Sequence, residues 1–118
     1  RAATERDRPL DLYVQVEFVR SGEPEATIEA SARRACALVA ESESLRLVGL
    51  MTLPPFDPDP EVARPYFVRL RQLRDRIARE EGITLPGLSM GMSGDFEVAV
   101  EEGATIIRLG TTLFGKRN

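Results

Sequence analysis

Several residue types are scarce in this chain, and each scarcity excludes a class of chemistry. There is no histidine, so acid–base chemistry near neutral pH would need another group. The single cysteine, Cys36, excludes an internal disulfide and fits a small buried residue of a helix. Of the sixteen basic residues fifteen are arginine, and the one lysine is Lys116. No interior lysine is therefore present to form a Schiff base.

Charge and hydropathy limit the partners and the compartment. The net charge is −3 and both signs are well mixed, so nothing predicts nucleic-acid binding. No apolar run approaches the length of a membrane span, and no signal peptide is visible. We therefore expect a cytoplasmic protein without membrane contact, without a metal site, and with one domain spanning residues 1–118.

The hydrophobic pattern alternates between strand-like and helix-like segments. The segment 45–53 is apolar on both faces, which is typical of a strand inside a parallel sheet. The predicted elements are strands at 10–19, 45–53, 85–92 and 104–114, and helices at 24–41, 61–81 and 96–102. This β-α-β-α-β-α-β order predicts an α/β fold whose parallel strands are joined by right-handed crossovers.

Polar residues on the strands favour a barrel over an open sheet. By strict alternation, three sets of residues each share one strand face: Gln15 with Glu17, Ser89 with Gly91 and Ser93, and Arg108 with Gly110. We predict a (β/α)8 TIM-barrel type of fold, of which this chain supplies about four βα units. Such a half-barrel leaves apolar surface and strand edges uncovered, so we expect self-association or an N-terminal half-barrel partner.

Two strand ends predict an anion site. The segments 88–95 and 106–115 each run from an apolar strand into a turn of Gly, Ser and Thr. The first turn opens a helix near Asp95, where free backbone N–H groups and the positive end of the helix dipole attract phosphate. Arg108 lies two residues before Gly110, at the start of the second turn.

The same two segments carry a family resemblance. The run LSMGMSGDFEVAVEEGATIIRLGTTLFGKR, with VGLMT upstream and an Arg- and Leu-rich helix between them, resembles the pyridoxal-phosphate-binding homeostasis proteins of the YggS/PROSC type. The resemblance covers about residues 45–117. It implies a TIM-type barrel related to that of alanine racemase, with pyridoxal 5′-phosphate at the carboxyl ends of the strands. It also implies a function in vitamin B6 homeostasis, as a carrier and not an enzyme.

The resemblance assigns roles position by position. It implies that Ser93 with its turn, and Gly110 with Thr111, hold the cofactor phosphate. Arg108 would face the ring nitrogen or the phosphate, and the methionines Met90 and Met92 would wall the site. The lysine that binds the cofactor aldehyde lies in the family's N-terminal half, and Lys116 is no substitute. Binding by this chain alone would therefore be non-covalent.

Structural interpretations of the same residues stay open. Ser89 and Ser93 fit small polar packing residues, the two methionines fit a core, and Asp95 fits the start of a helix. Arg108 could pair with Glu17 across the sheet. Glu101 and Glu102 fit the solvated end of a helix. The alternative function is a structural half-barrel module with a vestigial phosphate site. A third and weaker hypothesis is an amino-acid racemase, because neither the lysine nor a second acid–base group is visible.

Overall fold

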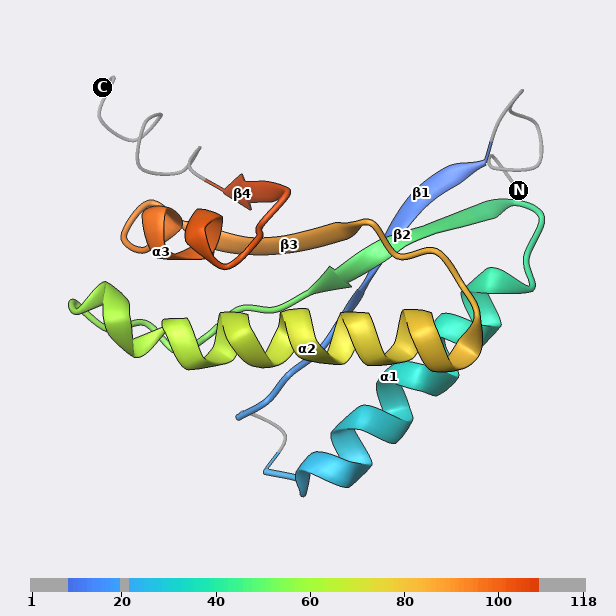
Figure 1. Ribbon diagram of the computed structural model, residues 1–118, viewed down its shortest axis with the longest axis horizontal. Helices are drawn as coiled ribbons and strands as arrows, with labels where there is room; N and C mark the ends of the chain where they lie inside the picture. Colours follow the sequence, from blue (N-terminus) through green and yellow to red (C-terminus); the bar gives the residue numbers. More distant parts are fainter. Residues whose placement is uncertain (1–8, 20–21, 109–118) are drawn as a thin grey trace.

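A computed structural model describes residues 9–19 and 22–108 of the chain. Strands and α-helices alternate along these residues, and a 3-10 turn precedes the second helix (Figure 1). The elements are β1 (Leu10–Gln15), α1 (Glu25–Ala40), β2 (Leu45–Met51), η2 (Pro60–Val62), α2 (Arg64–Glu81), β3 (Gly87–Met92), α3 (Phe96–Glu101) and β4 (Ile106–Arg108). The predicted order of elements is confirmed.

The four strands form one parallel sheet in the order β1-β2-β3-β4. Right-handed crossovers between successive neighbours all return over the same face, so the three helices cover one face of the sheet. Accordingly, α1 contacts β1 and β2, α2 contacts β2 and β3, and α3 contacts β3 and β4 (Figure 1). This arrangement is half of a (β/α)8 barrel, as predicted.

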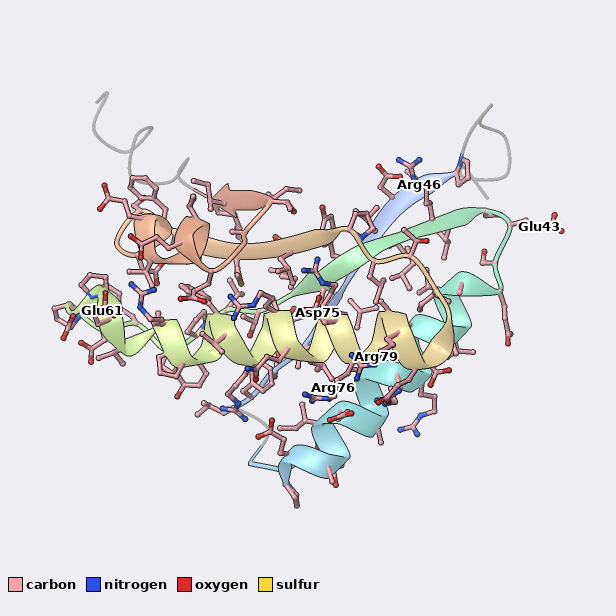
Figure 2. All side chains as sticks on the ribbon, in the orientation of Figure 1. Glu43, Arg46, Glu61, Asp75, Arg76 and Arg79 are labelled. Atoms are coloured by element: carbon pink, nitrogen blue, oxygen red, sulfur yellow. The ribbon has the colours of Figure 1, made fainter. Side chains whose placement is uncertain are left out.

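The hydrophobic core lies between the sheet and the helices. Helix α2 supplies more of its buried residues than any other element, because Phe67, Leu70, Leu73 and Ile77 recur at helical spacing along one face. Its other faces carry charge. Arg76 reaches across to Glu29 of α1 at 2.9 Å, and Arg33 of α1 binds the same carboxylate at 2.9 Å. Figure 2 shows Arg76 on the side of α2 that is turned toward α1.

No helix of residues 9–19 and 22–108 covers the opposite face of the sheet, which we call the open face. Tyr13 lies over a glycine pair there: a Cβ on Gly49 would lie 1.8 Å from the carbonyl oxygen of Gly87, and a Cβ on Gly87 would lie 2.7 Å from the Tyr13 ring. Only glycine therefore fits at position 49, where the obstacle is backbone, whereas a side chain at position 87 would require the Tyr13 ring to move. The next row of the open face is formed by register partners on successive strands, namely Gln15, Met51, Ser89 and Ile106.

Several element bounds differ from the predictions. The strands predicted at 10–19 and 45–53 end earlier, at Gln15 and Met51, and the strand predicted at 85–92 begins at Gly87. The helix predicted over 61–81 is divided into η2 and α2. Prolines cause this division, because Pro60 and Pro65 lack an N–H and fit only the first turn of a helix.

Candidate functional site

The carboxyl ends of β1 to β4 all lie at one edge of the parallel sheet, which we call the strand-end edge. Barrels of parallel strands carry their sites at this edge, because the loops that follow the strands converge there. Hollows along it include one at the turn after β3 beside β4, a cavity between the ends of β1 and β2, and another between β1 and α1.

The turn after β3 is closed by Asp95. The backbone N–H of Met92 donates to Oδ1 of Asp95 at 2.8 Å, and the N–H of Asp95 donates to the carbonyl oxygen of Met92 at 3.1 Å. The side chain of Asp95 therefore bonds back to the residue that precedes the turn, and it does not cap the amino end of α3. No acceptor among residues 9–19 and 22–108 takes the N–H of Ser93 or Gly94, and both residues are exposed. These two N–H groups remain available to an anion.

Gly91 determines which side chains reach the site. Its φ is +106°, and a Cβ there would lie 2.7 Å from Cβ of Ala99 and 3.0 Å from Cγ2 of Ile107. The register runs from Ser89 opposite Ile106 to Met92 opposite Arg108, so β3 uses one residue more than β4. The prediction that Gly91 shares the face of Ser89 is therefore wrong. The bulge turns Gly91 toward α3 and places Met92 beside Arg108.

The two methionines assigned to the site are separated by the fold. Met90 is 2% exposed and belongs to the core, whereas Met92 is 43% exposed beside Arg108. Arg108 is itself exposed, and in the described part of the chain it forms no ion pair, so the alternative pairing with Glu17 is not present. Gly110 and Thr111 lie outside the described residues, as does Lys116.

Helix α3 is fixed to α2 through Glu102. This carboxylate accepts hydrogen bonds from Arg64 at 2.6 Å and from Arg71 at 2.5 Å, and its side chain is 15% exposed. The same two guanidinium groups, that of Arg64 foremost, hold the pKa of Glu102 below its ordinary value. The interpretation of Glu102 as part of a solvated helix end is wrong. Because α3 has six residues, its dipole is small, and this anchoring positions the turn instead.

A cavity of about 420 Å³ lies between the ends of β1 and β2 and the start of α2. It is much larger than the hollow of about 80 Å³ beside Ser93. Sequence reasoning noted Gln15 and Glu17 on one strand face but missed the cavity, because one wall is Tyr66 from α2. The described lining residues are Gln15, Glu17, Phe18, Val19, Thr52, Leu53, Pro54, Pro55 and Tyr66.

The described residues contain no group of metal ligands and no helix that could cross a membrane. Across residues 9–19 and 22–108, no three Cys, Asp or Glu side chains come together in a group that could hold a metal ion. Every helix of the same residues is too short or too polar to cross a bilayer. The features found at the strand-end edge are the N–H groups of Ser93 and Gly94, the side chain of Arg108 and the cavity beside β1 and β2.

Comparison with known proteins confirms the resemblance seen in the sequence. Residues 1–118 match the family described as the alanine racemase N-terminal domain. The pyridoxal phosphate homeostasis protein of Aquifex aeolicus is 60% identical over 77 residues, which are 65% of this chain and 34% of that protein. The homologue of the same name in Mycobacterium leprae is 42% identical over 117 residues, 97% of this chain and 44% of that protein.

A solved structure shares the fold. PipY of Synechococcus elongatus, determined with PLP bound, superposes with a TM-score of 0.78 at 31% identity, over 96% of this chain and 52% of PipY. The chain thus spans less than half of each of the two curated relatives and about half of PipY. It belongs to the family of alanine racemase N-terminal domains, and its relatives there include pyridoxal phosphate homeostasis proteins.

Proposed function

We propose that this chain binds pyridoxal 5′-phosphate at its strand-end edge and acts in vitamin B6 homeostasis as a non-catalytic cytoplasmic carrier. The observation that carries this proposal is the superposition of PipY, a protein determined with PLP bound, over 96% of the chain. The names of the curated relatives support the same function.

The residues at the end of β3 fit the phosphate group of the cofactor. A phosphate accepts hydrogen bonds, and the N–H groups of Ser93 and Gly94 offer two donors that the described residues leave unused. Arg108 adds a cationic fork from the neighbouring strand, and Met92 lies in register with it as an apolar wall. Gly110 and Thr111, which follow Arg108 in the sequence, are proposed to complete the phosphate contacts.

The donor set supports holding the cofactor without covalent attachment. When bound, the cofactor supplies an aldehyde that reacts with amines. No lysine stands among residues 9–19 and 22–108, and the whole chain has no histidine. The chain's own residues would therefore bind and orient the phosphate end and leave the aldehyde accessible, as a carrier requires.

The apolar side chains of the open face favour the binding of a partner. It presents Tyr13, Met51 and Ile106 without a covering helix in the described residues, and its sheet has free edges at β1 and β4. We propose that a second copy or an N-terminal half-barrel covers this face. The same feature favours the alternative function, a structural half-barrel module. Native mass spectrometry separates the two, because an assembled species that takes up no cofactor would favour the module.

The binding site is tested by isothermal titration with pyridoxal 5′-phosphate and with pyridoxine 5′-phosphate, which lacks the aldehyde. We expect both ligands to bind with similar affinity. Arg108→Ala should weaken both by about tenfold or more, since a charge-assisted contact to phosphate is lost. The matched control is Arg46→Ala, because Arg46 lies near the amino end of β2, away from the strand-end edge (Figure 2). Unchanged affinity in both Arg108→Ala and Thr111→Ala would disprove the site.

A further inference from the structure

We propose that two copies of this chain join through the loop of residues 52–59, which runs from β2 to η2 (Figure 1). The Phe56 side chain of each copy enters the cavity between the ends of β1 and β2 of the other copy. The contact is twofold, because one loop supplies both the inserted ring and part of the wall that receives it. It is separate from the cover of the open face, and it does not rest on cofactor binding.

Phe56 lies in water in the middle of the loop. It is 88% exposed, which is the largest exposed fraction among the large apolar side chains of residues 9–19 and 22–108. Aromatic rings are enriched in protein interfaces, because their burial removes a large apolar area from water. A single exposed apolar residue is ordinary on a surface, but this one stands on a rigid loop beside an apolar cavity.

The loop holds Phe56 in place before any partner binds. Prolines occupy positions 54, 55, 58 and 60, and each ring fixes one backbone torsion. The N–H of Asp59 donates to Oδ1 of Asp57 at 2.9 Å, and the N–H of Glu61 donates to Oδ1 of Asp59 at 3.0 Å. Glu61 is paired with Arg64 at 2.7 Å, which connects the loop to α2. Little conformational entropy is therefore lost when the ring enters a partner.

The cavity that receives the ring lies beside the same loop. Pro54 and Pro55 form part of its wall, together with the aromatic rings of Phe18 and Tyr66. Its volume of about 420 Å³ is within the range of about 300–1,000 Å³ typical of small-molecule pockets, so a phenyl ring fits. Phe56 follows Pro55 in the sequence but stays exposed and does not fill the cavity of its own chain. Each copy therefore offers one ring and one cavity to the other.

The polar groups of the cavity already have partners. The hydroxyl group of Thr52 donates to the carbonyl oxygen of Val16 at 2.8 Å, and the N–H of Thr52 donates to the carbonyl oxygen of Ser89 at 3.2 Å. Glu17 is engaged by Nε2 of Gln15 at 3.3 Å and by a further contact. An uncharged apolar ring therefore suits this lining, and no charged ligand is required to complete it.

Charges on the two sides of the contact are complementary. Asp57 follows Phe56 and brings a negative charge with the ring. The guanidinium group of Arg69 stands at the aromatic wall of the cavity, with its Cζ 4.3 Å from the centroid of the Phe18 ring. Arg69 pairs with Glu25 through one nitrogen at 2.7 Å, and a guanidinium group carries five N–H donors. We expect Asp57 of one copy to lie near Arg69 of the other, which fixes their orientation.

Sedimentation equilibrium of the full chain tests the association. A contact made by one loop is smaller than the roughly 1,200 Å² that stable complexes bury, so we expect a dissociation constant of about 0.1 mM. Phe56→Ala removes both rings and should raise this constant about a hundredfold, or about tenfold for each ring. The control, Leu38→Ala, removes a side chain that is 67% exposed on α1 and should leave it unchanged. A monomeric chain, or a dimer that Phe56→Ala does not weaken, would overturn the proposal.

Two complementary variants show by NMR where the ring goes. Phe56→Ala keeps the cavity, whereas Leu53→Trp keeps the ring and narrows the cavity with a larger side chain. The amide signals of Val19 and Tyr66 report on the cavity. Unlabelled Leu53→Trp should shift them in labelled Phe56→Ala with a dissociation constant of about 1 mM, because one of the two rings is still inserted. An unlabelled chain with both substitutions is the matched control. Equal shifts from the two titrants would contradict insertion of the ring.

A peptide distinguishes a second copy from another protein as the occupant. The acetylated and amidated peptide LPPFDPD copies residues 53–59, and it should shift the signals of Val19 and Tyr66 in Phe56→Ala. The peptide LPPADPD, which lacks the ring, should not. If LPPFDPD binds but the unaltered chain stays monomeric, the cavity takes an aromatic side chain of another protein, and the second-copy proposal falls.

Discussion

The two faces of the sheet differ both in their side chains and in their surroundings: the helix-facing side is apolar, whereas the open face mixes apolar residues such as Met51 and Ile106 with polar ones such as Gln15 and Ser89. Leu50 and Met51 are neighbours on β2: Leu50 faces the helices and is fully buried, whereas Met51 lies on the open face and is half-buried. The helix-facing side has a closed core, while Ile106 on the open face is 45% exposed. The comparison shows that β2 is apolar on both faces although only one face is covered by a helix of the described residues, and strands that are apolar on both faces are typical of sheets that are covered on both sides.

The largest expected effect separates the two faces. Leu50→Ala should lower the free energy of unfolding by about 2–5 kcal/mol, because it leaves a cavity in a closed core. Met51→Ala should lower it by less than about 1 kcal/mol, since this side chain keeps contact with solvent. Urea unfolding at several protein concentrations measures both. If both substitutions lower the free energy of unfolding equally, and the loss grows with protein concentration, a second copy of the chain covers the open face.

A smaller effect is expected from the ion pairs of the helix layer. Arg64 and Arg71 hold the pKa of Glu102 below its ordinary value of 4.5, and Arg76 with Arg33 does the same for Glu29. The unfolded chain binds protons at the ordinary value, so this stability is complete well above pH 4.5 and is lost as the pH falls below it. Glu102→Gln should lower the free energy of unfolding at pH 7 by about 1 kcal/mol.

Urea midpoints measured from pH 7 to pH 3 check this effect. The fall of stability below pH 4.5 should be shallower in Glu102→Gln than in the unaltered chain, because one of the two carboxylates no longer titrates. A parallel fall in both proteins would contradict the role given to Glu102.

The smallest effect is expected at an exposed ion pair of the strands. Arg46 of β2 binds Asp11 of β1 at 2.8 Å, and both side chains are more than half exposed. Water and salt screen such a pair, so Arg46→Gln should leave the urea midpoint unchanged. A clear loss of stability at 0.5 M salt would mean that the amino ends of these strands are covered in solution.

Local patterns predicted the fold well and the site only partly. Helical spacing identified the buried face of α2, and the order of elements led to the parallel half-barrel. The bulge at Gly91 was missed, because it depends on side chains of α3 and β4 that no local pattern reveals. Glu102 was misread for the same reason, since its partners Arg64 and Arg71 lie 38 and 31 residues away. The turns after the two strands and Arg108 were predicted as an anion site from the residues themselves, and the family resemblance added the cofactor; the roles of Ser93 and Arg108 stay predictions.

The order of the strands has a consequence for how this chain acquires its structure. Among the described strands, each pairs only with its neighbours in the sequence, so every one of these pairings closes a loop of a single helical unit. Short loops have a small closure entropy, and chains dominated by near-neighbour contacts fold quickly. No strand has to insert between two strands that are already paired. The sheet can therefore grow by one βα unit at a time, and either edge can accept the next unit, whether from the same chain or another.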